Sequence, residues 1–68
     1  MLFGDLFREY RKNARLSQKQ VADLLGIRQS NISNWEKNKN RPEYEHLIAL
    51  AKLYQVTIEE LLGAEGLR

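Results

Sequence analysis

The chain is 68 residues long, carries a formal net charge of +2 and contains no cysteine. A chain of this length buries little core, and without cysteine it forms neither disulfides nor thiolate metal sites. Its single histidine, His46, is too few for a histidine-based metal site. The length suits one domain, residues 1–68. We find no nucleophile paired with a base, so we expect that this domain is not an enzyme and uses no metal, cofactor or small-molecule substrate.

The apolar and charged residues bear on location and partners. No apolar run approaches the roughly 20 residues of a membrane span, and Asp5 near the N-terminus is unlike a signal peptide, so we expect a cytoplasmic protein without a membrane partner. Residues 8–41 hold nine basic and three acidic side chains, whereas residues 42–68 carry a net charge of −3. This polarity is expected of a protein that turns one face toward a polyanion, although a solvated surface gives the same pattern.

All predicted elements are helices, and the first two have clear limits. A stripe of apolar residues at helical spacing marks the first helix: Phe3, Leu6, Phe7 and Tyr10. We place this helix over about residues 4–14. Ser17 and Gln20 have the spacing of a capping box, which predicts a second helix over residues 18–25. Gly26 ends it, because glycine adopts the left-handed conformation without steric cost.

Three further helices are predicted over about residues 29–37, 43–54 and 58–62. Ile32 and Trp35 are the inward positions of the third helix. Pro42 is placed to open the fourth, and Thr57 with Glu60 forms a second capping box that opens the fifth. We therefore expect a compact, all-α domain of five helices.

The short connection between the second and third predicted helices lies within a set of residues that recurs in one family. The set comprises Leu16-Ser17-Gln18, Ala22, Gly26-Ile27, Ile32, Trp35-Glu36, Pro42 and the closing stretch from Val56 to Leu62. At this spacing, residues 16–62 resemble the XRE helix-turn-helix family of Cro-type and lambda-type phage repressors. The resemblance implies a lambda-repressor-like fold in which the second helix of the motif enters the major groove of double-stranded DNA.

The outward face of the third predicted helix is rich in uncharged hydrogen-bonding side chains. At about 100° per residue, Ile32, Trp35 and Glu36 share one side of the helix, opposite this polar face. An ordinary surface helix has such a face too, but amide side chains also pair with adenine in the major groove. By the resemblance, base contacts are expected from Gln29, Ser30 and Asn34, with Asn31 and Ser33 as further candidates.

Phosphate contacts are expected around the same helix. Gln18 stands at the N-terminus of the second helix, where free N–H groups and the helix dipole favour an anion. The resemblance implies that Gln18 touches a phosphate and braces the third helix. Further candidates flank the third helix: Lys39, Arg41, Asn38 and Arg28.

The resemblance also implies structural roles. Arg11 and Glu36 stand where relatives pair an arginine with a glutamate, and we expect a structural ion pair. Arg28 replaces the serine or threonine that caps the third helix in relatives, which predicts a poorer cap. Arg15 and Asn38 replace glycines, which predicts left-handed backbone at both positions. On that basis, Asn38→Gly is expected to be neutral or slightly stabilising.

These features predict a function and leave an alternative open. We expect a sequence-specific transcriptional regulator, a repressor, that binds an inverted-repeat operator at the nucleoid as a homodimer. Candidate residues for the dimer interface are Tyr54, Ile58, Leu61, Leu62 and Leu67. The alternative is an adaptor or antitoxin component that uses this fold to bind a regulatory protein partner, with DNA binding secondary. The uncharged face of the third helix favours the first function, since an adaptor does not need it.

Overall fold

The computed structural model describes residues 2–63, and all regular elements in this range are helices. They are α1 (Phe3–Asn13), α2 (Gln18–Leu25), α3 (Gln29–Glu36), α4 (Tyr44–Tyr54) and α5 (Ile58–Leu62). The predicted limits of α2 and α5 are confirmed. Helix α1 begins and ends one residue before its predicted limits, α3 ends one residue early at Glu36, and α4 begins one residue late at Tyr44.

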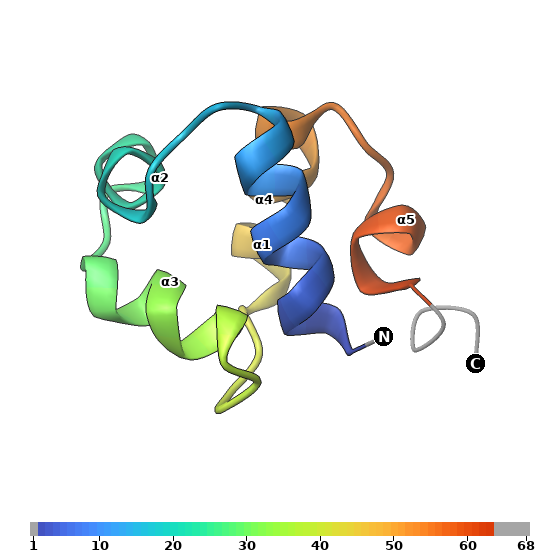
Figure 1. The fold of residues 1–68 in the computed structure, drawn as a ribbon, viewed down its shortest axis with the longest axis horizontal. Coiled ribbons are helices and arrows are strands. Elements are labelled where there is room, and N and C mark those ends of the chain that lie inside the picture. The colour runs from blue at the N-terminus through green and yellow to red at the C-terminus, as the bar shows by residue number, and fades with distance from the viewer. Residues whose placement is uncertain (1, 64–68) are drawn as a thin grey trace.

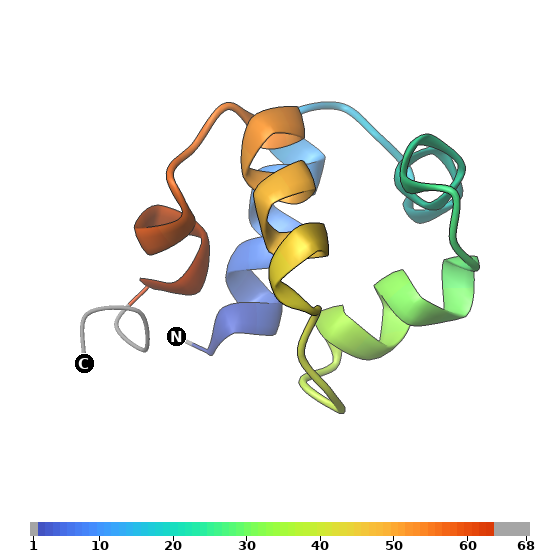
Figure 2. The same ribbon diagram turned by 180° about the vertical axis from the view of Figure 1, so that it is seen from behind.

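Helix α1 lies at the centre of the fold. It packs against α3, α4 and α5, while α2 packs against α3 (Figure 1). The reverse view shows α4 lying alongside α1, with α5 on one side of this pair and α2 and α3 on the other (Figure 2). The pair α2 and α3 therefore stands at one end of the molecule, where α3 keeps a face uncovered.

Two helices begin with the predicted capping boxes. The Ser17 hydroxyl accepts the Gln20 N–H at 3.0 Å, and the Gln20 side-chain carbonyl accepts the Ser17 N–H at 2.8 Å. Thr57 and Glu60 repeat both bonds at the start of α5. Each box satisfies N–H groups that have no partner within the helix, which explains why these starts could be placed from sequence.

Four helices end in left-handed residues: Arg15 (φ 61°), Gly26 (φ 71°), Asn38 (φ 63°) and Gln55 (φ 59°). In each case the next N–H bonds back to a carbonyl five residues earlier, as Ile27 does to Ala22 at 3.0 Å. This is the Schellman arrangement, which satisfies carbonyls at the end of a helix. The predictions for Arg15 and Asn38 are confirmed, whereas Gln55 was not anticipated.

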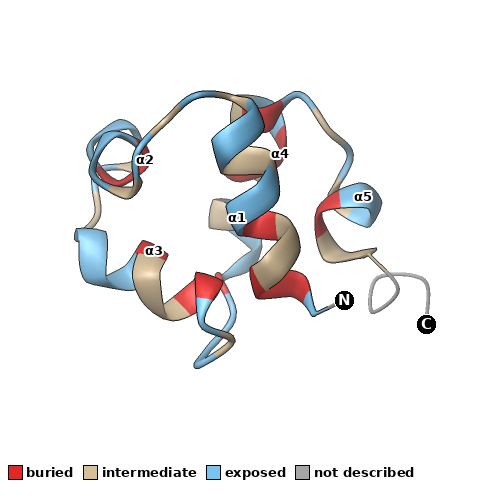
Figure 3. Cartoon of the chain, in the orientation of Figure 1, coloured by how far each residue is buried: buried red, intermediate tan, exposed pale blue. Residues whose placement is uncertain are grey.

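The core is assembled from all five helices, and its buried residues line the inner sides of the ribbons (Figure 3). Its largest fully buried side chains are Phe7, Ile32, Leu50, Leu61 and Val21. The rings of Phe3 and Phe7 meet edge to face, with centroids 5.3 Å apart. Trp35 is 6 % exposed and belongs to this core, as its inward position in the sequence predicted.

Gly4 allows α1 to approach the end of α3 closely. A Cβ atom at this position would lie 2.6 Å from the backbone carbonyl oxygens of both Trp35 and Glu36. Only a residue without a side chain fits at such distances, because backbone atoms of a packed helix cannot move away cheaply. The start of α1 is therefore fitted directly onto the end of α3.

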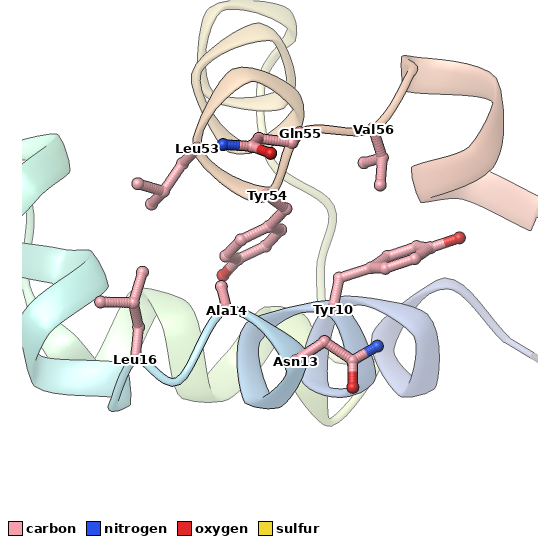
Figure 4. Close-up of a pocket in the computed structure, with 8 residues that line it drawn as sticks. All are labelled: Tyr10, Asn13, Ala14, Leu16, Leu53, Tyr54, Gln55 and Val56. Carbon is pink, nitrogen blue, oxygen red and sulfur yellow. The ribbon is translucent and has the colours of Figure 1, made fainter.

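The C-terminal ends of α1 and α4 enclose a hollow of about 450 Å³ (Figure 4). Tyr54 extends from α4 toward Ala14, and Tyr10 on α1 donates its hydroxyl to the Glu60 carbonyl at 3.3 Å. Burial, and secondarily the nearby charge of Glu36, raises the pKa of Tyr54 above its ordinary value. Tyr54 is thus a core residue that lies near the charged side chains of Glu36 and Arg11.

Candidate nucleic-acid interface

Helix α3 buries one side and presents the other to solvent. Ile32, Trp35 and Glu36 face inward, and each is less than a tenth exposed. The polar positions divide into exposed Gln29, Ser30 and Asn31 and half-exposed Ser33 and Asn34. The N-terminal half of α3 is the more exposed part of the helix (Figure 3). The structure therefore places the predicted base-contacting residues on a face that another molecule can reach.

The turn between α2 and α3 is set by local chemistry. Gly26 ends α2 in the left-handed conformation, and Arg28 is the N-cap of α3. The Arg28 side chain makes no capping hydrogen bond, because a guanidinium has donors but no acceptor. The poorer cap predicted for α3 is confirmed, and the exposed side chain of Arg28 places a positive charge beside the first turn of this helix.

The predicted ion pair between Arg11 and Glu36 is present and bidentate. Arg11 Nε donates to Glu36 Oε2 at 2.6 Å, and Nη2 donates to Oε1 at 3.0 Å. Arg11 Nη1 also donates to the Leu16 carbonyl at 2.9 Å. The hydrogen bond to Glu36 raises the pKa of Arg11, opposed by a smaller effect of burial. The pair joins α1 to the last residue of α3.

Gln18 completes this network from the start of α2. Its Nε2 donates to Glu36 Oε1 at 3.0 Å, so one carboxylate receives hydrogen bonds from both α1 and α2. The bracing of α3 that the sequence predicted for Gln18 is therefore present. An amide nitrogen carries two hydrogens, and the one that is not directed at Glu36 can serve a phosphate oxygen. Glu36 fixes the orientation of this amide, and Arg11 compensates the buried negative charge.

The loop after α3 combines structural and exposed polar residues. Asn38 Oδ1 accepts the N–H of Gly4 at 2.9 Å, so this atom is committed to the start of α1 rather than to a ligand. The Arg41 guanidinium lies over the Phe3 ring, 5.1 Å from its centroid. Lys39 is exposed. Of the phosphate candidates in this loop, Lys39 and Arg41 present cations, whereas Asn38 acts first as a cap.

A small hollow of about 250 Å³ adjoins α3 and this loop. Its lining residues are Asn31, Trp35, Asn40, Arg41, Glu43 and His46. The His46 ring lies 5.5 Å from that of Trp35 and tilts against it, which accounts for its half-buried position. The hollow brings Asn31, a predicted base-contacting residue, beside Arg41, a predicted phosphate-contacting residue. The sequence did not single out Asn40 and Glu43, because their relation to α3 arises only from the folded loop.

Burial corrects part of the predicted dimer interface. Leu61 is 0 % exposed and Tyr54 is 8 % exposed, so both serve the core of one protomer and offer almost no surface to a second. Ile58 and Leu62 are half-exposed at α5, and Leu67 lies outside the described residues. An apolar residue at a helical position suits either a core or an interface, which is why the sequence did not separate the two groups.

The described part of the chain offers neither a membrane span nor a metal cluster. None of the helices in residues 2–63 has the length and apolar character needed to cross a bilayer. Within the same residues, histidine, aspartate and glutamate side chains do not gather in threes as a metal site requires.

Comparison with known proteins places the chain in a family. A helix-turn-helix family model matches residues 7–61. The transcriptional regulator AnsR of Bacillus subtilis is 43 % identical over 90 % of this chain, and the transcriptional activator BcrR of Enterococcus faecalis is 37 % identical over 98 % of it. The chain spans 53 % of AnsR and 33 % of BcrR, so it corresponds to part of each relative.

A solved structure agrees with this assignment. The P22 c2 repressor, crystallised with a synthetic operator, superposes with a TM-score of 0.85 and 32 % sequence identity. The match covers 91 % of this chain and 94 % of that one. The helix order, the α2–α3 turn and these matches lead to one conclusion: the chain belongs to the XRE-type helix-turn-helix family of DNA-binding domains.

Proposed function

We propose that the chain is the DNA-binding part of a transcriptional repressor that reads double-stranded DNA as a homodimer. The observation that carries the proposal is the exposed face of α3, where Gln29, Ser30 and Asn31 offer donors and acceptors without charge. A helix fits the major groove of B-DNA, and its side chains can hydrogen-bond to base edges there. In this proposal α3 is the recognition helix, the helix that contacts the bases.

Base contacts belong to the polar residues of the recognition helix. Gln29 and Asn34 have amide groups that can pair with the N6 and N7 atoms of adenine, and Ser30 can serve a donor or an acceptor. Asn31 and Ser33 border this face and extend it. The buried side of the helix, with Ile32 and Trp35 in the core, holds these residues in a fixed orientation.

Phosphate contacts surround the recognition helix at three places. Gln18 stands at the N-terminus of α2, where backbone N–H groups and the helix dipole favour an anion. Lys39 and Arg41 follow the recognition helix, and Arg28 precedes it. Such contacts fix the position of the protein on the duplex and contribute affinity for every sequence. In this proposal Asn38 contributes through its side-chain N–H₂ group, because a phosphate oxygen accepts hydrogen bonds and only this group can donate them.

A homodimer fits the small size of the domain. Ile58 and Leu62 lie half-exposed around α5 and pack against the core from outside, so a second copy could cover them. Burial of such residues about a two-fold axis would supplement a small core. Two recognition helices related by this axis would meet successive major grooves on one side of the duplex.

Repression is the simplest mode of action for this surface. A protein that occupies an operator blocks access to it without any further contact, whereas activation requires a surface for the transcription machinery. Known relatives include proteins named as an activator, BcrR, and as a repressor, the C2 protein of Salmonella phage P22. Such a protein would act at the nucleoid, where its operator lies.

Selection from a pool of random double-stranded DNA tests this function. Purified protein should enrich one motif, an inverted repeat with half-site centres roughly 10 to 11 base pairs apart. Sedimentation on the selected site should show two protomers per duplex. If the protein enriches no motif, or binds one copy per site without a dyad, the dimeric repressor is excluded. A protein that retains no DNA but captures a specific protein partner would then be the adaptor or antitoxin component.

A further inference from the structure

The first turn of α1 is attached to the loop after the recognition helix by two contacts. Asn38 Oδ1 accepts the Gly4 N–H at 2.9 Å, and the guanidinium of Arg41 lies 5.1 Å from the centroid of the Phe3 ring. Phe3 and Gly4 are adjacent, so both contacts come from one turn of helix. The loop that supplies the proposed phosphate contacts is therefore not an independent segment.

The Phe3 ring is a fixed platform for Arg41. Phe3 is 6 % exposed, and its edge-to-face contact with Phe7 holds the ring from the side of the core. Gly4 brings the same turn within contact distance of the Trp35 and Glu36 carbonyls. A guanidinium that stacks on an aromatic face is attracted to the ring while its N–H groups remain arranged around its rim.

We propose that Phe3 is a positioning residue for DNA binding, which holds Arg41 in the orientation that meets a backbone phosphate. The inference rests on the proposed function and adds α1 to its machinery. A flexible arginine loses rotamer freedom when it binds a phosphate, and a side chain already ordered in the free protein loses less. The ring therefore increases affinity for all DNA sequences alike, since phosphate contacts carry no sequence information.

The test compares Phe3→Leu with Phe7→Leu by DNA binding at a temperature where circular dichroism shows both variants folded. Leucine keeps an apolar side chain but removes the aromatic face. Phe3→Leu should weaken binding about two- to tenfold per DNA-bound protomer, equally on the selected site and on random DNA. The slope of log affinity against log salt should stay that of the wild type, because Arg41 still reaches the phosphate in the complex. Phe7→Leu removes a ring that supports Phe3 but does not underlie Arg41, so it should weaken binding less than Phe3→Leu does. Phe3→Tyr retains the aromatic face and should restore wild-type affinity.

A double-mutant cycle decides whether the effect passes through Arg41. In an Arg41→Ala background, Phe3→Leu should leave DNA affinity unchanged, since the ring then has no guanidinium to hold. The inference is overturned if Phe3→Leu leaves affinity unchanged or increases it in the wild-type background, or weakens binding equally in both backgrounds. Should Phe3→Tyr be poorly folded, the leucine cycle alone decides between these results. A wild-type protein that binds no DNA overturns the proposed function itself, which is a distinct outcome.

Discussion

The side chain of Asn38 caps helix α1, because its Oδ1 accepts the backbone N–H of Gly4 at 2.9 Å across 34 residues of sequence. Leu2 is the N-cap residue of α1 and its side chain makes no capping hydrogen bond, so Asn38 supplies that bond from a distant loop. Asn38 also adopts the left-handed conformation that ends α3. One asparagine thus ends α3 and begins α1.

This double role reverses the expectation for Asn38→Gly. Glycine adopts a φ of 63° more readily than asparagine, but it removes the cap, which costs about 0.5 to 2 kcal/mol. We expect Asn38→Gly to lower the free energy of unfolding by about 1 kcal/mol. Asn38→Ala should cost more, because it loses the cap and also strains the left-handed backbone. Urea unfolding of the three proteins checks the order Asn, Gly, Ala, and a glycine variant as stable as the wild type would contradict the cap.

Gly4→Ala should destabilise the protein although alanine is the better helix former. Its Cβ would lie 2.6 Å from the carbonyl oxygens of Trp35 and Glu36, so α1 must move away from α3. Overpacking of this kind costs roughly 1 to 3 kcal/mol, which exceeds the gain in helix propensity. Gly26→Ala is the control, since its Cβ would meet no atom within 4 Å and only its φ of 71° is unfavourable. Thermal unfolding measures both losses: that of Gly26→Ala should stay within the roughly 1 to 2 kcal/mol of left-handed strain, and a Gly4→Ala protein of raised stability would refute the close approach.

Removal of one partner of the Arg11–Glu36 pair should be among the most damaging polar substitutions. The side chains are 12 % and 5 % exposed, so Arg11→Met leaves a nearly buried carboxylate without its bidentate partner. The expected loss is about 3 to 5 kcal/mol in the free energy of unfolding. The pair Lys19–Asp23, at 72 % and 67 % exposure, is the comparison, and Lys19→Met should have little effect. The double variant Arg11→Met/Glu36→Met should recover part of the loss, and additive effects would show that the two residues act independently.

The raised pKa of Tyr54 predicts a loss of stability at alkaline pH. The folded protein holds the phenolic proton more tightly than the unfolded chain, whose tyrosine pKa is near 10.0. The contribution is fully present below that pH and is lost as the pH rises toward the folded-state pKa. Tyr54→Phe should remove this part of the decline, whereas Tyr44→Phe, at a residue 68 % exposed, should not. Urea denaturation at pH values between about 8 and 11 measures the free energy of unfolding of each variant. If this free energy falls with pH equally in Tyr54→Phe and Tyr44→Phe, Tyr54 has no role in the decline.

Local chemistry explains why most of the fold could be predicted from sequence. The capping boxes at Ser17 and Thr57 are written in residues three positions apart, and both helix starts were placed correctly. Helix α4 starts without a capping side chain, and its observed start at Tyr44 lies one residue after the predicted start. Gln55 adopts the left-handed conformation without a glycine or asparagine to indicate it.

The family resemblance supplied the distant contacts of Glu36 with Arg11 and Gln18, and other contacts between distant residues of the candidate site could not be predicted. The helical spacing of Ile32 and Trp35 predicted the buried side of α3, and the polar residues on the opposite side were therefore expected to be exposed. The role of Gly4 was missed, because only the folded structure brings its Cα beside α3. The commitment of the Asn38 oxygen was missed for the same reason. Leu61 was placed at an interface, because a sequence does not reveal whether an apolar residue faces its own core or a second protomer.

Base reading by α3 is tested by comparing Gln29→Ala with Lys39→Ala on the selected operator and on every single-base variant of one half-site. If α3 reads bases, Gln29→Ala should lose about 1 to 3 kcal/mol on the preferred base at one position, flatten selectivity there and keep the wild-type salt dependence. Lys39→Ala should weaken binding to all variants alike and reduce the salt slope by about one per DNA-bound protomer. If Gln29→Ala instead weakens every variant equally, α3 does not read the major groove and the proposed function is contradicted.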